Sequence, residues 1–318
     1  MSGAATCGAA IKADGYGLGA AWVAETLAVA GCRDFFVATW SEAAALATRG
    51  LPNLSVFHGV RDEDMALALS GIATPVLNTA AQAARWRAAG GGACHVMLDT
   101  GMNRLGLGED DLAAGALDGL AIDTLMSHLA SADEDSAQNS DQRGRFVAMA
   151  GRVTARRLSL ANSAAIALGS DYAFDLTRPG LALYGGVPRP ELAGTIVQVA
   201  YPEAQVLQRR TVRAGEAVGY NATWIAPADT EIAILNYGYA DGYFRGFSGR
   251  GTALLGDAAL PLIGRVSMDL LAIDVTGHDV AEGDWLPIDF DLPRAAAASG
   301  MSQYELLTGL GSRFDRIG

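Results

Sequence analysis

The chain has little cysteine, little histidine and too little positive charge for binding nucleic acids. Its three cysteines (Cys7, Cys32 and Cys94) are widely spaced and fit neither a disulfide framework nor a zinc site, and its four histidines lack the spacing of metal ligands. Among 318 residues, 35 are Asp or Glu and 23 are Lys or Arg, and the net charge of −12 argues against a surface that binds phosphate backbones. No apolar run approaches the roughly 18–20 residues of a membrane-spanning helix, and no secretory leader is visible. We therefore expect a cytoplasmic globular protein without metal, membrane or nucleic-acid partners.

Hydrophobic residues are abundant, at 50% against 18% charged residues, so the chain can bury a large core. In the first half, short apolar runs alternate with alanine-rich segments of helical spacing, which is typical of parallel βαβ units. The apolar runs are Ala9–Ile11, Phe35–Thr39, Leu54–Phe57, Thr74–Leu77, Cys94–Leu98, Ile122–Met126, Leu158–Ser159 and Leu181–Tyr184. A helix is expected at Ser41–Arg49, with Ser41 as its N-cap. This series of units predicts a (β/α)8 barrel of the TIM type more than an open sheet.

The pattern changes after Pro188–Pro190. Short β-branched segments separated by Gly, Pro and Asp predict strands at Ile196–Val199, Glu203–Val212, Ala217–Val218, Thr230–Ile234, Thr252–Leu255 and Leu270–Val275. No long amphipathic helix is expected before Met301–Leu310. The sequence therefore predicts two domains, an α/β barrel over residues 1–192 and a mostly β domain over residues 193–318.

A lysine follows the first apolar run. Lys12 lies in IKADGYG, where a glycine-rich turn leads into a helix, and barrels keep their active sites at such strand ends. A half-buried lysine loses hydration, so its pKa falls and it becomes a usable nucleophile or base. Taken alone, this segment is more typical of an ordinary surface lysine.

Four further strand ends carry polar groups. Arg104 follows one strand in DTGMNRLG, and His128 follows another in SHLASAD. The segment Asn162–Ala165 can open a helix with a hydroxyl and free N–H groups, and Arg178 comes just before a glycine. Each residue alone is more typical of packing or ion pairing, but five such signals at successive strand ends are much harder to explain as packing.

These segments occur in a familiar order. The set IKADGYG, DTGMNRLG, SHLASAD, NSAA, RPGLALYG, VGYNATW, NYGYADGYFR, GRVSMD and YELLTGLGSR resembles the alanine racemase family. The resemblance implies a homodimer that uses pyridoxal phosphate (PLP) on a barrel followed by a β domain. It also implies interconversion of L- and D-alanine that supplies D-alanine for cell-wall peptidoglycan.

The resemblance assigns the two bases of racemisation. Lys12 resembles the lysine that holds PLP as a Schiff base and then serves as one base. Tyr220, in VGYNATW, resembles the tyrosine that reaches in from the partner subunit as the second base, although alone it is more typical of a core or hairpin tyrosine. Racemisation removes a proton from one face of the α-carbon and returns one to the other, so it needs two such groups.

Further roles follow from the same resemblance. Arg178 resembles the arginine bonded to the pyridine nitrogen, and His128 the residue that packs near the ring and bonds to Arg178. Arg104 resembles the residue that contacts the phenolic oxygen of PLP and the substrate carboxylate. Met268 resembles the residue whose backbone N–H also binds that carboxylate. The remaining matches are the PLP-binding positions Tyr16, Asn162, Ser163, Gly180, Leu181 and Ser312, and the substrate-entrance positions Asp133, Tyr239, Arg245 and Arg265.

The chain departs from the family pattern in three places. Lys12 comes earlier than in the family, so part of the first barrel unit is expected to be missing. Met97 takes the place of a lysine that many members carbamylate to brace Arg104, so Asn103 or a bound anion is expected to brace it instead. Ser312 stands where many members have a tyrosine.

Other functions compete with this interpretation. A basic amino-acid decarboxylase pairs a similar barrel with a β domain but places a carboxylate, not an arginine, against the pyridine nitrogen. A PLP-binding homeostasis protein has a single domain, and no transmembrane or extra domain supports a sensor. A serine or broad-specificity racemase of the same family remains open.

Overall fold

The computed structural model describes residues 1–317, which form two compact units. Unit 1 comprises Met1–Leu183 and Pro188–Thr195, and unit 2 comprises Tyr184–Val187 and the residues from Ile196 onward. Among the described residues, no helix combines the length and apolar character that crossing a membrane requires.

Unit 1 is built on parallel strands. Seven of them form one sheet in the order of the sequence, from β2 to β8. The strands of unit 1 are β1 (Thr6–Cys7), β2 (Ala9–Ala10), β3 (Asp34–Val37), β4 (Asn53–Val56), β5 (Thr74–Leu77), β6 (Cys94–Met97), β7 (Ile122–Met126), β8 (Arg157–Ser159) and β9 (Leu176–Thr177). β3 and β6 are buried along their whole length, as expected for parallel strands covered on both faces.

β9 closes the sheet into a ring. It pairs in parallel with β1, and the N–H groups of Thr6 and Ala10 donate to the carbonyl oxygens of Asp175 and Pro179. On its other side, the Arg178 N–H donates to the carbonyl oxygen of Ala161, just beyond β8. The barrel prediction is therefore confirmed, with the first strand present in two pieces, β1 and β2. The expected run Leu181–Tyr184 is not a strand but a 3₁₀ turn, because the chain leaves the ring after β9.

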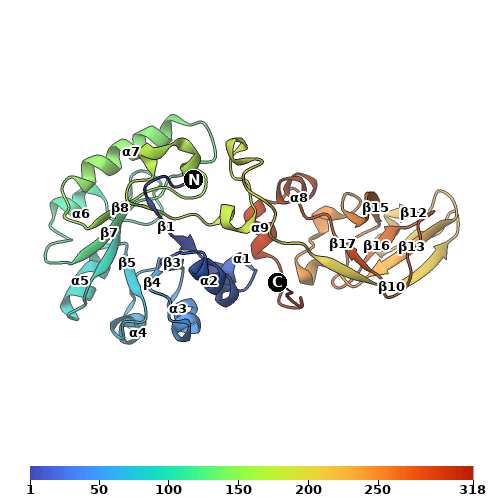
Figure 1. The fold of residues 1–318 in the computed structure, drawn as a ribbon, viewed down its shortest axis with the longest axis horizontal. Helices are drawn as coiled ribbons and strands as arrows, with labels where there is room; N and C mark the ends of the chain where they lie inside the picture. Colours follow the sequence, from blue (N-terminus) through green and yellow to red (C-terminus); the bar gives the residue numbers. More distant parts are fainter. Residues whose placement is uncertain (318) are drawn as a thin grey trace. The chain divides into compact units, whose positions relative to one another are not determined.

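Helices cover the outside of this sheet (Figure 1). They are α2 (Ala20–Val29), α3 (Trp40–Leu46), α4 (Met65–Leu69), α5 (Ala80–Ala88), α6 (Glu109–Ala113) and α7 (Ala137–Ala150). The expectation that Ser41 caps α3 is wrong. Thr39 is the N-cap, because Glu42 stands at the third helical position and the two form a reciprocal capping box.

Unit 2 is mostly antiparallel sheet. Its six-stranded sheet has the order β14-β15-β16-β13-β10-β17, and β11 and β12 form a separate hairpin. The elements are β10 (Glu203–Val212), β11 (Ala217–Val218), β12 (Trp224–Ile225), β13 (Thr230–Leu235), β14 (Thr252–Leu255), β15 (Ala258–Ile263), β16 (Leu271–Asp274), β17 (Trp285–Pro287), α8 (Leu292–Ser299) and α9 (Gln303–Thr308). The expected strand Ile196–Val199 is absent from this described unit, and α8 was not expected.

A polar network fills the barrel near the beginnings of its strands. The His95 ring bonds to the Ser55 hydroxyl through Nε2 at 3.1 Å, and its Nδ1 lies 3.6 Å from the Asp123 carboxylate. Arg157 joins that carboxylate to Asp34 at 3.1 and 2.8 Å. Burial lowers the pKa of His95 to about 4, although the Asp123 carboxylate acts in the opposite direction. The imidazole is therefore neutral at physiological pH.

This network predicts acid sensitivity that depends on one residue. Because the folded-state pKa of His95 lies below the unfolded-state value near 6.5, its contribution to stability is complete above pH 6.5 and is lost as the pH falls toward 4. In the His95→Gln variant, the stability lost between pH 7 and pH 5 should be smaller than in the wild type by about 2 kcal/mol. Calorimetric melting at both pH values measures this. His58→Gln, at an exposed histidine, is the control and should keep the wild-type pH dependence.

Candidate active site

Lys12 begins a left-handed helical turn. The segment Lys12–Tyr16 follows β2, and its residues Ala13, Asp14 and Tyr16 have positive φ values of 53°, 52° and 54°. Its bonds run from the Gly15 N–H to the Ile11 carbonyl and from the Gly17 N–H to the Ala13 carbonyl, as in a helix, but the coil is left-handed. Left-handed geometry costs each non-glycine residue roughly 1–2 kcal/mol, so the surroundings must hold this turn in place.

Two carboxylates hold the turn. The Asp14 carboxylate accepts the Ala20 N–H at 2.8 Å and so caps α2, whose N-cap is a glycine. The Glu42 carboxylate accepts the Ala13 N–H at 2.7 Å. The chain therefore fixes the peptide bonds on either side of the turn, and with them the direction of the lysine side chain.

The environment of Lys12 favours the neutral amine. Burial lowers the pKa of Lys12 below its ordinary value, and the positive charge of Arg104 lowers it further. The Glu42 carboxylate acts against both. An amine with a lowered pKa is the form that attacks a carbonyl carbon or accepts a proton.

His128 lies among positive groups. Burial, and then the charges of Arg178, Arg104 and Lys12, lower the pKa of His128 to about 3. The ring is therefore neutral at physiological pH. It can pack against an aromatic ligand without adding a further positive charge to the site.

Arg178 is a buried cation, 4% exposed. Its guanidinium donates to the Ser127 carbonyl oxygen at 2.6 Å and to the Ser159 hydroxyl. Burial lowers its pKa to about 10, so it stays charged at physiological pH. Among residues 1–317 it has neither a carboxylate partner nor the expected bond to His128, because its donors are directed to Ser127 and Ser159. A buried charge without a counter-charge is costly, and its unused N–H groups can meet a ligand acceptor.

A buried hydroxyl and a close glycine lie where the phosphate site is expected. Ser163 is 2% exposed, and its Oγ accepts the N–H groups of Gly180 and Ala182 at 2.9 and 3.1 Å. Both lone pairs are used, so the hydroxyl proton is left for an outside acceptor such as a phosphate oxygen. A Cβ at Gly180 would lie 2.2 Å from the Tyr16 hydroxyl oxygen, so only glycine allows this approach.

Neighbouring residues shape the same phosphate site. The Asn162 side chain accepts the N–H of Ala165, the first residue of the 3₁₀ helix Ala165–Leu168, at 2.9 Å. The Ser163 hydroxyl was expected to open this helix but accepts from Gly180 and Ala182 instead. Leu181 is buried and begins the turn after Gly180. The segments around Ser163 and Gly180 are therefore joined by direct bonds, although they lie apart in the sequence.

Arg104 stands on a tightly folded loop. The Asp99 carboxylate accepts the N–H groups of Gly101, Met102 and Asn103 at 2.9 to 3.1 Å. The Arg104 side chain is exposed and, within residues 1–317, has no hydrogen-bond or ion-pair partner. The expected brace by Asn103 is therefore not formed within this chain.

Met97 does not take part in this loop. Its side chain is buried in the barrel interior with Phe36, Val76, Met126 and Leu176. The position that many members of the family fill with a modified lysine is thus part of an apolar cluster.

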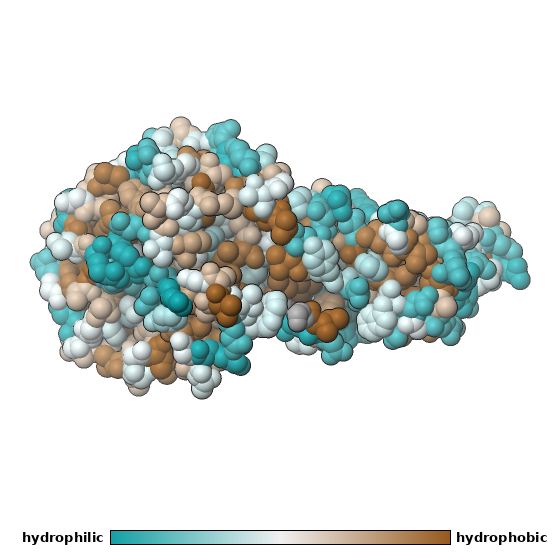
Figure 2. Space-filling model, viewed as in Figure 1, coloured by the Kyte–Doolittle hydropathy of each residue, from teal (hydrophilic) through white to brown (hydrophobic). Residues whose placement is uncertain are grey.

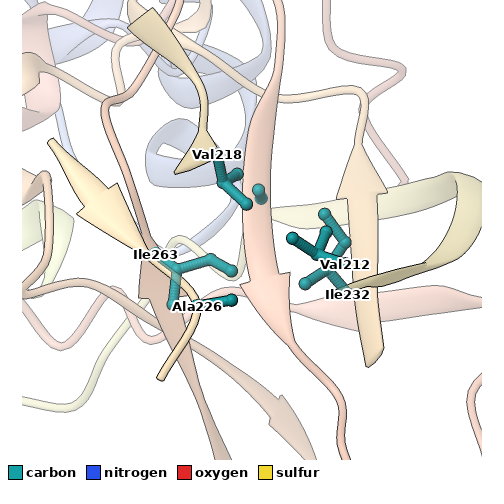
Figure 3. Close-up of a cluster of buried hydrophobic side chains, with 6 residues drawn as sticks. Val212, Val218, Ala226, Ile232 and Ile263 are labelled. Atoms are coloured by element: carbon teal, nitrogen blue, oxygen red, sulfur yellow. The ribbon is translucent and has the colours of Figure 1, made fainter. Parts of the chain in front are cut away.

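Tyr220 lies at the tip of the β11–β12 hairpin in unit 2. Val218, two residues before it, is buried with Val212, Ile232 and Ile263 (Figure 3). The tip itself is strained, because Asn221 and Ala222 have φ values of 63° and 49°. The Tyr220 side chain is 64% exposed, so the hairpin presents it outward from unit 2.

Met268 lies on a loop that the C-terminal segment fastens. The Met268 carbonyl accepts the Ala240 N–H at 3.0 Å. Arg313 donates to Asp241 and to Asp269, both at 2.7 Å, and so ties the two sides of this contact together. Ser312, next to Arg313, is exposed.

The structure gathers part of the expected entrance. The Arg245 guanidinium stacks over the Tyr239 ring at 5.2 Å, and Arg265 is exposed beside the Tyr220 hairpin, with its backbone next to Gly219. These three residues belong to unit 2. Asp133 belongs to unit 1 and is exposed there.

Sequence reasoning missed three residues that support the site: Glu42, Ser127 and Ser159. A Thr-x-x-Glu pattern was available for Glu42, because it announces a capping box. No local pattern points to Ser127 or Ser159, since each acts on Arg178 from a different strand.

Comparison with known proteins identifies the family. One family model, for the N-terminal domain of alanine racemase, matches residues 1–188, and another, for its C-terminal domain, matches residues 199–318. The chain belongs to the alanine racemase family. This membership confirms the expected fold, the racemase activity on alanine and PLP as the cofactor. It decides against the decarboxylase and against the single-domain homeostasis protein.

Individual relatives are similar over nearly their whole length. Alanine racemases of Acidiphilium cryptum and Dinoroseobacter shibae are 44% and 45% identical, over 96% and 97% of this chain and 90% and 89% of those proteins. Among solved structures, alanine racemase from Bartonella henselae with covalently bound pyridoxal phosphate is 32% identical, with a TM-score of 0.92, over 99% of this chain and 93% of that one. Biosynthetic alanine racemase from Pseudomonas aeruginosa is also 32% identical, with a TM-score of 0.87, over 97% and 91%.

The bonds at Ser163 predict a linked loss of stability and cofactor affinity. Ser163→Ala leaves the N–H groups of Gly180 and Ala182 without an acceptor, which costs about 1–3 kcal/mol. It also removes a donor to phosphate. We expect a lower melting temperature without cofactor and a PLP dissociation constant raised by roughly tenfold or more. Ser140→Ala, which removes an exposed hydroxyl on α7, is the control. Unchanged PLP affinity in Ser163→Ala would rule out this phosphate site.

Proposed function

We propose that Lys12 and Tyr220 are the two bases with which this alanine racemase moves protons, on PLP held by residues 1–192. Residues 193–318 supply the second base. The observation that carries the proposal is the Lys12 turn, where burial and Arg104 favour a neutral amine at a strand end. Family membership assigns the reaction, and the environment of Lys12 and the exposure of Tyr220 support these roles.

The residues around Lys12 fit the cofactor. The Ser163 hydroxyl proton, the Gly180 approach and the Tyr16 hydroxyl suit a phosphate dianion, and Asn162 and Leu181 shape the turns beside them. Arg178 suits the pyridine nitrogen, since its guanidinium is buried and has no acid partner in the described chain. His128 suits the ring face because it is neutral. Ser312 would complete the set from unit 2.

The two bases act on opposite faces of the substrate's α-carbon. Bound PLP draws electrons from that carbon and so makes its hydrogen acidic. Arg178 offers only donors to the pyridine nitrogen, which therefore stays unprotonated and draws electrons less strongly. Lys12 takes or returns the proton on one face, and Tyr220 does so on the other. Arg104 and the Met268 N–H hold the substrate carboxylate, and Asp133, Tyr239, Arg245 and Arg265 belong to the substrate entrance.

The surface of unit 2 supports a homodimer with a shared site. Tyr220, Ile225, Met268 and Leu270 are all exposed, and the hairpin and the 264–270 loop are adjacent, since a Cβ at Gly264 would lie 2.8 Å from the Val218 carbonyl oxygen. Figure 2 shows brown hydrophobic side chains on the surface of both units. Apolar groups gathered around a catalytic tyrosine favour burial against a second subunit.

The cellular role follows from the product. We propose that the D-alanine supplies cell-wall peptidoglycan, in line with the description of the Pseudomonas aeruginosa relative as biosynthetic. The three cysteines, Cys7, Cys32 and Cys94, are free thiols. This supports the proposal that the enzyme acts in a reducing cytoplasm.

The first test locates the cofactor. Borohydride reduction of the PLP-loaded protein should fix the label on Lys12, because that amine has the favourable environment. Peptide mapping by mass spectrometry reads the position. Lys12 is the only lysine of the sequence, so the competing amine is the N-terminal one. A label there, or no label at all, would remove Lys12 from the mechanism.

The second test separates the two bases. Tyr220→Phe should lower kcat by about 100- to 10,000-fold, as the loss of one acid–base group does, while borohydride labelling of Lys12 persists. Tyr201→Phe, at another exposed tyrosine of unit 2, should keep full activity. Heterodimers of Lys12→Ala and Tyr220→Phe subunits should regain one working site. Confirmed heterodimers without activity would contradict a shared site.

A further inference from the structure

A carboxylate outside the assigned roles holds the peptide that follows Lys12. Glu42 belongs to α3, yet its Oε1 accepts the N–H of Ala13 at 2.7 Å. Its Oε2 accepts the N–H groups of Ala38 and Thr39 at 2.7 and 3.0 Å. One side chain therefore joins the end of β2 to the end of β3, at the edge of the barrel where Lys12 lies.

These N–H groups belong to turns of opposite hand. Thr39 caps the right-handed helix α3, and the Glu42 carboxylate completes its capping box. The Ala13 N–H lies at the start of the left-handed turn, before the first bond inside it, from Gly15 to Ile11. The first N–H groups of any helical turn need an acceptor from elsewhere, and for Ala13 that acceptor is Glu42. The carboxylate thus stabilises a strained backbone directly beside the lysine.

Charge points to the same role. The charged groups that act on Lys12 are Arg104 and Glu42, and the neutral His128 ring lies within reach of the Lys12 charge. Arg104 disfavours the protonated amine, and Glu42 is the negative group that opposes it. Without Glu42, Lys12 would face positive neighbours only.

We propose that Glu42 is a positioning residue for Lys12, which fixes the Lys12–Ala13 peptide and keeps a negative charge beside the amine. This inference rests on the proposed attachment of PLP to Lys12. In that attachment the unprotonated amine nitrogen joins the aldehyde carbon of PLP, and water leaves. The rate of capture by the cofactor-free protein therefore reports both the charge and the orientation of the amine.

The experiment measures the rate of PLP capture against pH, by absorbance, in the wild type, Glu42→Gln and Thr39→Ala. Glu42→Gln removes the charge and keeps the size. Its capture profile should have a midpoint roughly 0.5–1 pH unit below that of the wild type and a plateau lowered severalfold. Thr39→Ala removes the hydroxyl that accepts the Glu42 N–H at 3.2 Å, so it loosens the same helix end without touching the charge. It should lower the melting temperature and leave the midpoint in place.

A second variant, Glu42→Asp, keeps the test decisive if Glu42→Gln folds poorly. Glu42→Asp keeps the charge but is one methylene shorter, so it should keep the wild-type midpoint and lower the plateau. A wild-type profile in Glu42→Gln, or a midpoint that moves equally in Thr39→Ala, overturns the proposal and leaves a purely structural cap. Borohydride mapping of the wild type separates the two hypotheses. Because the sequence has no second lysine, a label on the N-terminal amine, or no label, overturns both, whereas a label on Lys12 with unmoved profiles overturns the role of Glu42 alone.

Discussion

Closure of the parallel ring is the constraint on which the rest of unit 1 depends. Because β9 bonds to β1 on one side and to the chain beyond β8 on the other, the last strand returns beside the first. All strands point the same way, so the residues that follow them share one edge. Lys12 and Arg178 therefore lie at the same edge of the barrel although they are far apart in sequence. The ring closure sets which residues lie at this edge. The contacts of Ser163 and Glu42 then fix the local conformation of the loops there.

The alternation of side chains along the strands then divides the barrel interior into layers. Residues two apart face the same side of a strand. On the inner side, Met97 therefore lies one step nearer the carboxyl ends of the strands than His95, Ser159 than Arg157, and Arg178 than Leu176. The first layer is the polar network of His95 and Arg157. The next contains the apolar cluster with Met97, and the last carries Arg178 and the site. Apolar packing thus separates two charged layers and reduces the hydration of both.

The sequence predicted this architecture better than its details. Buried parallel strands are visible in a sequence as short apolar runs, so β5 and β7 were predicted with their observed bounds. β9 was missed because two residues carry no period, and its identity as a strand comes from pairing with β1. The motif residues fell where expected because each follows a strand. The acceptors of Arg178, by contrast, come from two separate segments, and the Ala13 N–H finds its acceptor on another helix, so no local pattern could reveal either contact.

The balance of charge explains why such a site is suited to an anionic cofactor. Lys12, Arg104 and Arg178 act together on His128, and in the described part of the chain Glu42 is the only negative group among the charges acting on Lys12. The half-buried Lys12 and the buried Arg178 repel other positive groups more strongly than they would in water. A phosphate dianion and a substrate carboxylate offset this repulsion. Relief of the repulsion therefore contributes favourably to the free energy of binding. A ligand that binds only the folded state also stabilises it. Groups of this charge therefore favour a doubly charged phosphate and a substrate that carries a carboxylate.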